Sequence, residues 1–569
     1  MTREMGARRR AAAASVVVLV LGLAACAPAM PETVVPDTVI AAGWTGELTS
    51  TNASASPTVG NTDIAAATRG GFGSIIDGEF VPDEGFGTVT IVSDDPFTVR
   101  YDLAEPAWSD GIPLDAADLV LGWAGASGLF PADDEVADDT SDAPAEITEV
   151  DEFARAIEVT FAEPDIDWQS AVTVPVPAHV VGQRALGIDD AMEAKQAVLR
   201  AVQDDDQEAL AAIGGVWNGG FDVTDADDID ADLLLSSGPF RIEDIGAGGR
   251  SVTLVPNADY RGPVTPQVAR IELAAPDGDP VTAVGDALDV VQVAPTAANR
   301  EPIHELERQD FTIDTSHDGT VWAVLLKTDA AFAQQPVRTA FLRAVQPTAV
   351  VAGGGGEWAS AAYTGTTSML AAPGSRAYDI VAEDSGFADA LAYAGNDAAA
   401  ERDAAGVGAG TPVCVLYDRG SEFATGAFAA MRDAVAETGW SLVDCGADDF
   451  DTALAQGNWN AVIARVPVPQ TPADIAAQWG TGGEASVTGN ADRARDELIA
   501  QLAVTTDVYE ARDVLARIEA SIVQASVALP LAVNPRLTII DKDVTGIAPR
   551  TGAIAPLTAG VVQWAVVPD

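Results

Sequence analysis

The segment from Val413 to Cys445 constrains the fold of this chain more strongly than any other part of the sequence. Two short apolar runs, Val413–Tyr417 and Trp440–Cys445, flank a longer stretch, Glu422–Thr438, whose apolar residues recur at helical spacing. Gly439 follows that stretch at the position where a helix usually ends. This order predicts a βαβ unit with parallel strands. Strand and helix patterns also alternate elsewhere, so the sequence predicts a mixed α/β protein of several lobes.

The first 26 residues predict the cellular compartment. Arg3 and Arg8–Arg10 form a basic segment, and residues 11–25 form an uncharged apolar run that is too short to span a membrane. The run ends in Leu23-Ala24-Ala25-Cys26, which resembles the lipobox of bacterial lipoproteins. The resemblance implies a signal peptide over residues 1–25, lipid on the Cys26 sulfur and a tether over residues 26–37; the alternative is an ordinary secretory signal. We therefore expect a protein at the extracytoplasmic face of a bacterial cell membrane, anchored by lipid alone.

The two later cysteines, Cys414 and Cys445, leave two alternatives open. A disulfide can persist in an exported protein. However, Cys414 lies at the start of one predicted strand and Cys445 at the end of its parallel partner. If these strands are adjacent and in register, the two Cα atoms lie beyond the ~7 Å that a disulfide can span. A disulfide and a pair of buried thiols both remain open.

The charge balance excludes one class of partner. Among 569 residues, 31 are Lys or Arg and 86 are Asp or Glu, which gives a formal net charge of -55. Nucleic-acid phosphates are bound by Lys and Arg, so no nucleic-acid partner is expected. Hydrophobic residues make up 48% of the chain, which is enough for sizeable buried cores.

Residue patterns of known catalytic and metal sites are absent. The three histidines, His179, His304 and His317, lie far apart, and no Cys/His cluster has metal-ligand spacing. The glycine run Gly353–Gly356 lacks the preceding strand and the Lys-Ser/Thr pair of a phosphate loop. Neither a nucleophile elbow nor a dinucleotide fingerprint occurs. We therefore expect no metal, no cofactor and no enzymatic activity.

A set of sequence blocks resembles a known family. The blocks are Thr98–Leu103 followed by Trp108–Gly111 and Pro113–Asp118, then Ser237–Phe240, Val255–Tyr260, Ala287–Val290 and Pro336–Ala340. In this order, behind a lipobox, they resemble the extracytoplasmic solute-binding proteins of ABC transporters, in the dipeptide, oligopeptide and nickel class called family 5. The resemblance extends from about Thr38 to Val567. Because these blocks mostly specify the fold in that family, we assign no ligand contact to them.

The resemblance implies a two-lobed, periplasmic-binding-protein-like α/β fold of type II, similar to cluster C, with an extra domain inserted near the N-terminus. Lobe I is expected to comprise residues 38–58, 175–297 and 527–569, the inserted domain II residues 59–173, and lobe III residues 300–526. Such lobes close on a ligand in the cleft between them by bending at their connections.

Candidate ligand-binding residues occupy aromatic and loop positions that match the cleft of the family. They are Trp44, Glu47, Leu48, Trp358, Tyr363, Trp459, Asn460, Arg465 and Trp479. Aromatic rings there would provide stacking area, and the alternative for each tryptophan is a packing role. Peptide-binding relatives usually hold the peptide amine with an Asp, whereas Asn460 stands at the nearest match. An amide cannot pair with ammonium as a carboxylate does, so the specificity is left open.

The resemblance implies a monomeric, lipid-anchored substrate-binding protein of an ABC importer. It would capture a peptide or peptide-like solute and deliver it to a permease that works with ATPase subunits. The alternative is a lipoprotein of the same fold that no longer transports and acts as a cell-envelope scaffold or regulator, for example in glycolipid assembly. The missing amine-binding Asp favours this alternative. Nickel and haem, which some relatives carry, are disfavoured by the three scattered histidines.

Overall fold

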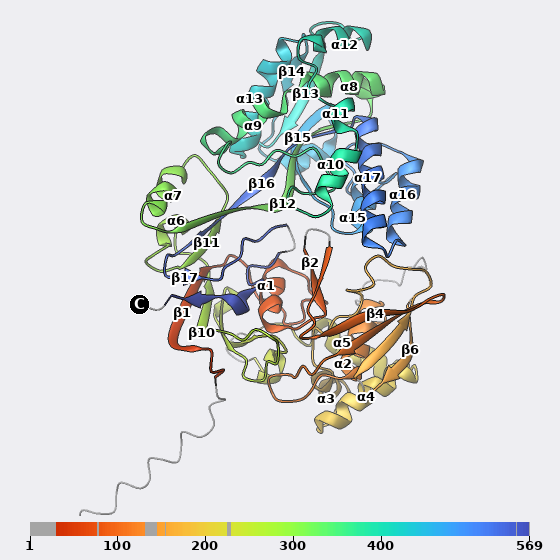
Figure 1. The fold of residues 1–569 in the computed structure, drawn as a ribbon, viewed down its shortest axis with the longest axis vertical. Helices are drawn as coiled ribbons and strands as arrows, with labels where there is room; N and C mark the ends of the chain where they lie inside the picture. Colours follow the sequence, from red (N-terminus) through yellow and green to blue (C-terminus); the bar gives the residue numbers. More distant parts are fainter. Residues whose placement is uncertain are drawn as a thin grey trace, which may run out of the picture.

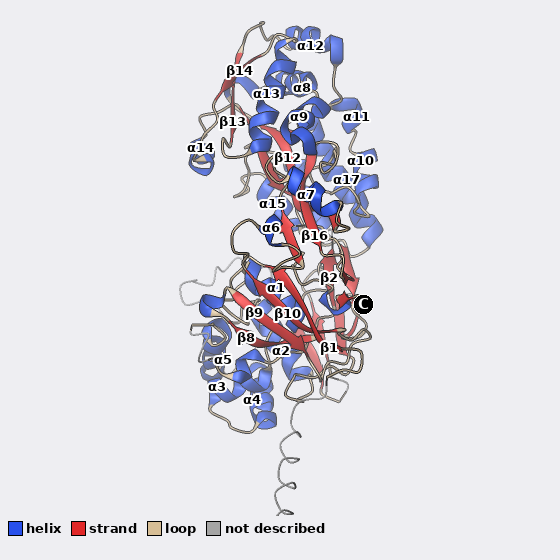
Figure 2. Cartoon of the chain, turned by 90° about the vertical axis from the view of Figure 1, so that its left-hand side faces the viewer, coloured by secondary structure: helices blue, strands red, loops and turns tan. Residues whose placement is uncertain are grey.

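One continuous β-sheet runs through most of the molecule in the computed structural model, which describes residues 30–76, 79–130, 145–153, 155–224, 229–552 and 555–567. The sheet has ten strands in the order β14-β13-β15-β12-β16-β11-β1-β10-β9-β8 (Figures 1 and 2). The predicted signal peptide and Cys26 lie outside the described residues. No helix in the described part of the chain has the length and hydropathy needed to span a membrane.

One strand near the N-terminus and four strands from the middle of the chain build the lower half of this sheet in Figure 2. They are β1 (Val35–Gly43), β8 (Phe240–Ile245), β9 (Ser251–Pro256), β10 (Val268–Ala274) and β11 (Val290–Val293). The helices near them are α1 (Val59–Thr68), α6 (Pro280–Ala283) and α7 (Arg300–Glu307), and a small pair of strands, β17 (Val544–Thr545) and β18 (Ala565–Val566), lies near the C-terminus.

The upper half contains the predicted βαβ unit. It comprises β13 (Pro412–Tyr417), α13 (Glu422–Ala436), β14 (Ser441–Asp444) and β15 (Ala461–Pro467), with β13 parallel to both neighbours. The prediction of a βαβ unit is therefore confirmed, and Gly439 adopts a φ of 86° just beyond the helix. The other helices of this half are α8 (Gln335–Ala344), α9 (Pro347–Gly355), α10 (Tyr378–Asp384), α11 (Phe387–Ala390), α12 (Ala398–Ala404), α14 (Phe450–Gln456), α15 (Pro472–Trp479), α16 (Arg493–Ala503) and α17 (Val508–Ala525).

A disulfide joins Cys414 and Cys445, whose Cα atoms are 5.6 Å apart. The expectation that the parallel register would hold these atoms too far apart was wrong. The register places Cys414 opposite Val443, only two residues before Cys445. Side chains of a strand alternate between faces, so Val443 and Cys445 point to the same side. The two sulfurs can therefore meet across the strand pair at the edge of the sheet.

Two long strands connect the halves. β12 (Thr312–Leu326) and β16 (Ala528–Ile540) pair antiparallel along most of their length. The register is interrupted between His317 and Val321, and Gly319 in this interruption has a φ of 80°. Above the break β12 also pairs with β15, and below it β16 also pairs with β11. The connection thus consists of two well-paired segments with a break between them.

The inserted domain contains a second sheet, of four strands, in the order β4-β5-β7-β6. Its elements are the hairpin β2 (Gly73–Ile76) and β3 (Glu79–Pro82), the strands β4 (Gly87–Asp94), β5 (Phe97–Leu103), β6 (Glu146–Asp151) and β7 (Ala156–Thr160), and α2 (Ala116–Ala126). Three further helices follow: α3 (Ala178–Leu186), α4 (Ala191–Gln203) and α5 (Gln207–Gly219).

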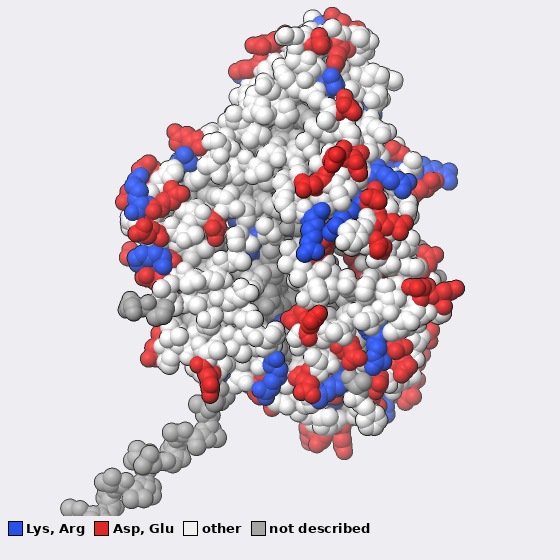
Figure 3. Space-filling model, in the orientation of Figure 1, with Lys and Arg blue, Asp and Glu red and all other residues white. Residues whose placement is uncertain are grey.

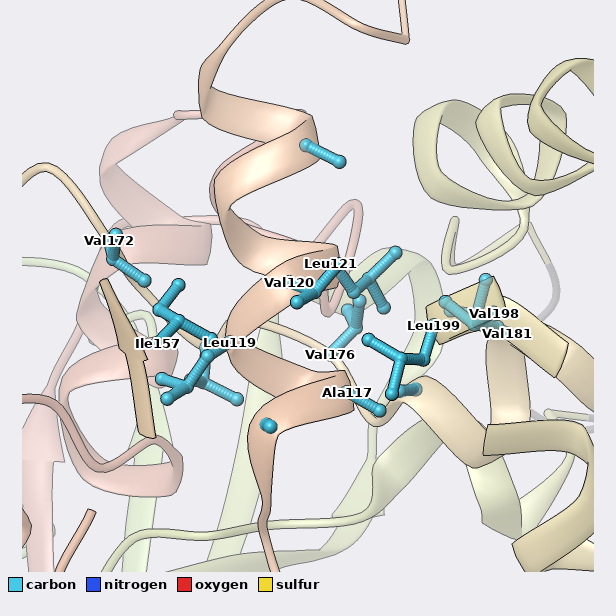
Figure 4. Packing of buried hydrophobic residues seen from close by; sticks show 14 of the residues in the cluster. Ala117, Leu119, Val120, Leu121, Ile157, Val172, Val176, Val181, Val198 and Leu199 are labelled. Atoms are coloured by element: carbon cyan, nitrogen blue, oxygen red, sulfur yellow. The ribbon is translucent and has the colours of Figure 1, made fainter. Parts of the chain in front are cut away.

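Helices α3 to α5 share one hydrophobic core with this small sheet and α2. Figure 4 shows Leu119 and Val120 of α2 between Ile157 of β7 on one side and Val181 and Leu199 of α3 and α4 on the other. The shared core favours extending the inserted domain beyond residue 173 to include these helices. The domain limits themselves remain a proposal.

The Trp108–Asp118 block fixes α2 against α4 through a buried ion pair. Nζ of Lys195 on α4 lies 2.7 Å from Oδ2 of Asp118, and both side chains are fully buried. Asp118 also accepts hydrogen bonds from Nε1 of Trp108 at 3.3 Å and from the backbone N of Ala178 at 3.0 Å. Asp115 begins α2 as its N-cap and lies 3.2 Å from the same Nζ. These contacts support the view that the block specifies the fold.

Removing the Lys195 ammonium should therefore destabilise the protein strongly. Lys195→Met leaves the Asp118 carboxylate buried without a cation, which typically costs about 3–5 kcal/mol of unfolding free energy. Urea denaturation followed by tryptophan fluorescence measures the change. Lys542→Met is the matched control, because among the described residues Lys542 forms an ion pair only with its exposed neighbour Asp543, and its effect should stay within about 0.5 kcal/mol. Equal effects of the two substitutions would contradict the conclusion that the buried Lys195–Asp118 ion pair stabilises the fold.

Candidate ligand-binding cleft

The inserted domain touches lobe III on the side of the molecule that faces α15 and α17 (Figure 1). Nε of Arg512 on α17 donates a hydrogen bond of 2.9 Å to Oε1 of Glu79 on β3, and both side chains are only 13% exposed. Arg376 reaches the other oxygen of Glu79 at 3.4 Å. The backbone N of Ile166 donates to the carbonyl of Ala503 at 2.8 Å. The two parts of the molecule are thus closed on one another at these points, while the face seen in Figure 3 is hollowed between its upper and lower halves.

A cavity of about 160 Å³ lies between the inserted domain and lobe III, beside these contacts. Most of its lining is apolar. From the inserted domain come Ile75, Phe80, Ile166 and Trp168, and from lobe III come Leu370, Ala371, Ala372, Val468, Pro469, Ile475, Leu502, Val508, Ala511 and Leu515. A concave apolar site with a few polar groups between two domains is the usual form of a ligand pocket in proteins.

Asp167 provides an unpaired carboxylate in the cavity lining. Burial, together with the negative charges of Asp165 and Asp474, raises the pKa of Asp167 to about 6. Both neighbours are held by backbone amides: Asp165 accepts from the N of Asp167 at 2.9 Å, and Asp474 accepts from the N of Thr471 at 3.0 Å. Among the described residues, no donor bonds the Asp167 carboxylate itself.

A buried glutamate shapes one wall of the cavity. Glu519 on α17 is 1% exposed and accepts hydrogen bonds from Oγ of Ser368 at 2.7 Å and from the backbone N of Leu370 at 3.0 Å. Burial raises the pKa of Glu519, and these hydrogen bonds oppose the rise. The carboxylate thereby holds the segment that supplies Leu370 to the cavity. Nothing in the sequence distinguishes Glu519 from the other acidic residues.

A polar cluster occupies the break between β12 and β16. Nδ2 of Asn534 donates to Oδ2 of Asp318 at 2.6 Å, and Nε1 of Trp322 donates to Oδ1 of Asn534 at 2.7 Å. Nη1 of Arg465 lies 3.6 Å from Oδ2 of Asp318, and the Arg465 side chain is 54% exposed. Arg465 also lies over the Trp322 ring, with its guanidinium carbon 5.9 Å from the ring centroid. The cluster ties the two connecting strands to β15.

The structure does not bring the nine predicted ligand-binding residues together, and none of them lines the cavity between the inserted domain and lobe III. Trp44 and Leu48 are buried in the core of lobe I, whereas Glu47 is exposed. Trp459 and Trp479 are buried in the core of lobe III.

Three of the remaining four predicted residues lie near the connections between the lobes. Trp358 and Tyr363 line a second cavity, of about 230 Å³, beside the segment that follows β11. Arg465 belongs to the polar cluster at the strand break. The fourth residue, Asn460, accepts a hydrogen bond from the backbone N of Cys414 at 3.0 Å and thus has a structural role.

Sequence reasoning missed the cavity residues Phe80, Asp167 and Arg512. Phe80 lies in a strand and Arg512 in a helix whose sequence patterns do not differ from those of other strands and helices. Asp167 lies two residues after Asp165, in a segment without a helix or strand. The described residues contain no group of three or more His, Cys, Asp and Glu side chains placed to hold a metal ion.

The raised pKa of Asp167 predicts a pH-dependent effect of its removal. The folded state binds the Asp167 proton more tightly than the unfolded state, so the carboxylate destabilises the fold increasingly as pH rises from about 4 through about 6. Asp167→Asn should therefore raise the melting temperature at pH 7.5 and leave it unchanged at pH 4. Because the group is partly exposed, the gain should be on the order of 1 kcal/mol. Differential scanning calorimetry at both pH values measures it. Asp451→Asn, on the exposed surface of α14, is the control, and an equal gain at both pH values would refute the prediction.

Comparison with known proteins defines the family. The model of the bacterial extracellular solute-binding proteins, family 5 (its middle region), matches residues 89–471. An uncharacterized lipoprotein of Mycobacterium tuberculosis is 26% identical over 520 residues, which cover 86% of this chain and 87% of the relative.

Solved structures share the fold at low identity. The periplasmic EDTA-binding protein EppA superposes on this chain with a TM-score of 0.71 at 17% identity. The superposition covers 93% of this chain and 97% of the EppA chain. The oligopeptide-binding protein AppA of Bacillus subtilis, solved with a nonapeptide, gives a TM-score of 0.59 at 12% identity and covers 93% and 99%. The expected two-lobed α/β fold is thereby confirmed, and proteins of this family bind solutes rather than catalyse reactions. The chain, as the five sequence blocks predicted, belongs to the bacterial extracellular solute-binding proteins of family 5.

Proposed function

We propose that this protein is a lipid-anchored substrate-binding protein of an ABC importer, which captures a peptide-like solute between its lobes by hinge closure and delivers it to a permease. Membership of family 5 supports a substrate-binding role in ABC transport. The observation that carries the proposal is the apolar cavity between the inserted domain and lobe III, because the Glu79–Arg512 ion pair spans the same two parts of the molecule.

The break between β12 and β16 supports hinge closure. The β12–β16 ladder is interrupted between His317 and Val321 and is irregular again between Trp322 and Ala323, and the side chains of Asn534 and Asp318 connect the two strands within the break. Bending is least costly where the fewest backbone hydrogen bonds must deform, so we place a hinge at residues 318–320.

The proposals of a lipid anchor and of a peptide-like ligand rest on similarity to known proteins. The Mycobacterium tuberculosis relative is named a lipoprotein, which supports an anchor at Cys26 and an extracytoplasmic location. One structural neighbour was solved with a nonapeptide and another is named for EDTA binding, so the shared fold accepts chemically different ligands. The cavity of about 160 Å³ is smaller than the ~300–1,000 Å³ of typical ligand pockets. It therefore suits one group of a ligand whose remainder extends along the cleft.

Native mass spectrometry should detect the captured solute. The secreted Cys26→Ser form of the full chain, purified without denaturation, should carry a family of small co-purifying masses that denaturation releases. Peptides among them would establish both ligand class and preferred length. A consistently empty protein that also shows no thermal shift with a peptide library would contradict the importer proposal and favour the scaffold alternative.

Breaking the Glu79–Arg512 pair should shorten the lifetime of the closed form. Both side chains are largely buried, so removing either charge should speed ligand release by about tenfold, or about 1.4 kcal/mol, even though Arg376 still lies beside Glu79 in Arg512→Gln. Stopped-flow dissociation of the co-purified ligand measures this for Glu79→Gln, Arg512→Gln and the double variant. The double variant should release ligand no faster than the worse single variant.

Arg493→Gln is the matched control for this test, because Arg493 is 92% exposed and its ion pair within the described structure is with Glu497 of the same helix. Additive effects of the two single substitutions would show that the contact does not couple the inserted domain to lobe III during release.

A further inference from the structure

The size and walls of the cavity between the inserted domain and lobe III select an apolar group. Ile75 and Phe80 contribute from one side and Leu370, Val468 and Leu515 from the other. Its volume of about 160 Å³ is close to that of an engineered apolar cavity of ~150 Å³ that excludes water and binds benzene. The cavity can therefore hold an aromatic ring or a branched alkyl group beside the polar side chains of its lining.

Apolar surface continues outside the cavity. Ile76 and Val81 of the β2–β3 hairpin are 48% and 41% exposed, and Val508 and Tyr509 at the start of α17 are 44% and 70% exposed. Val508 also lines the cavity, and Ile76 and Val81 are the strand neighbours of the lining residues Ile75 and Phe80. Exposed apolar side chains that gather beside a cavity indicate a site for an apolar ligand more strongly than the same residues scattered singly.

The charged groups of the cavity leave one negative charge without a partner. Its lining includes three charged side chains, Glu79, Arg512 and Asp167. Glu79 pairs with Arg512 and with the more exposed Arg376, which lies outside the lining, whereas Asp167 has no donor among the described residues. Oγ of Ser375, which also lines the cavity, is buried and has no hydrogen-bond partner there. The Asp167 carboxylate and the Ser375 hydroxyl can thus accept hydrogen bonds from a ligand that has N–H groups.

We propose that this cavity binds an organic cation, in which a bulky apolar body carries a protonated amine that pairs with Asp167. The inference rests on the proposed solute-binding function and specifies its ligand class. A charge-assisted hydrogen bond from ammonium to carboxylate is among the strongest that proteins make. The rings of Phe80 and Trp168 in the same lining add favourable contacts for a cation. A ligand with the same body and a carboxylate in place of the amine would instead face an uncompensated like charge.

The surroundings of Asp167 give the binding a characteristic pH dependence. Asp165 lies two residues before it, Asp474 lies on α15, and Glu79 and Arg512 lie on β3 and α17. Burial and the like charges of Asp165 and Asp474 raise the pKa of Asp167 to about 6. Below that pH the carboxylate becomes neutral and loses its attraction for ammonium. Affinity for a cationic ligand should therefore fall between pH 7.5 and pH 5, whereas affinity for a neutral apolar ligand should not.

A matched pair of probes tests the charge preference. 4-Phenylbutylamine and 4-phenylbutyrate share one apolar body and carry opposite charges at neutral pH. Isothermal titration calorimetry with the Cys26→Ser form of the full chain should give at least about tenfold tighter binding of the amine at pH 7.5. Asp167→Asn should abolish this preference and its pH dependence, while Asp451→Asn retains both. Ala511→Phe, which fills the cavity from α17, should abolish binding of both probes, with thermal unfolding as the check of its fold.

The possible outcomes distinguish a failure of the organic-cation proposal from a failure of the proposed solute-binding function. Equal binding of the two probes, tighter binding of the acid, or an unchanged preference in Asp167→Asn overturns the organic-cation proposal. If native mass spectrometry still detects a co-purified solute, the solute-binding function stands without it. If neither probe binds and no solute co-purifies, both proposals fall.

Discussion

The pairing of β12 with β16 determines where every other part of the molecule lies. The part of this pair before residue 318 of β12 lies in the lobe I half of the ten-stranded sheet, next to β11. The part after residue 320 of β12 lies in the lobe III half, next to β15. A single ladder thus fixes the relative orientation of two large bodies, and a small bend in it moves the inserted domain relative to α15 and α17. The polar cluster of Asp318, Asn534 and Trp322 satisfies side chains at the break, so a bend there does not expose an apolar core.

Buried charges in this protein serve two distinct purposes. Lys195 and Asp118 neutralise one another, and Arg338 donates hydrogen bonds of 2.9 Å to the carbonyls of Ala525 and Phe332. Glu519 has no cationic partner in the described part of the chain, but backbone amides and the Ser368 hydroxyl donate hydrogen bonds to its carboxylate. Asp167 differs because its neighbours are like charges and its own oxygens accept no hydrogen bond among the described residues. A carboxylate that the fold leaves unsatisfied is one that a ligand can satisfy.

Local pattern was sufficient for the architecture and insufficient for the site. The βαβ unit around Val413–Cys445 could be predicted because helix and strand periodicity are local properties of the chain. The disulfide could not, because it depends on which residue of one short strand lies opposite which residue of the next. Trp44, Trp459 and Trp479 matched cleft positions in sequence, yet they are buried in cores. A large aromatic residue has the same local pattern in both settings.

The cavity is formed by segments that lie far apart in the sequence. Its walls come from segments around residues 75–80, 166–170, 370–377, 468–475 and 502–515, and in sequence each of these reads as an ordinary half-buried stretch. Only the closure of the inserted domain on lobe III brings them together. No single segment therefore contains the signal, and the five blocks that identified the family lie outside the cavity lining.

Closure and charge selection are linked through Glu79. In the closed arrangement Arg512 and the more exposed Arg376 pair with Glu79, so Asp167 is the carboxylate of the lining that remains to pair with a ligand cation. If the lobes separate as proposed, Glu79 loses both arginines and adds its negative charge to the open mouth of the inserted domain. The mouth is then more negative during capture than after closure, within a chain whose formal net charge is -55. Such a field concentrates cations at the cleft and raises their association rate. When Glu79 pairs again on closure, the long-range attraction for cations falls, whereas the short-range contact between the ligand and Asp167 remains. Selection for charge therefore acts mainly as the ligand enters, and selection for shape acts mainly in the closed form.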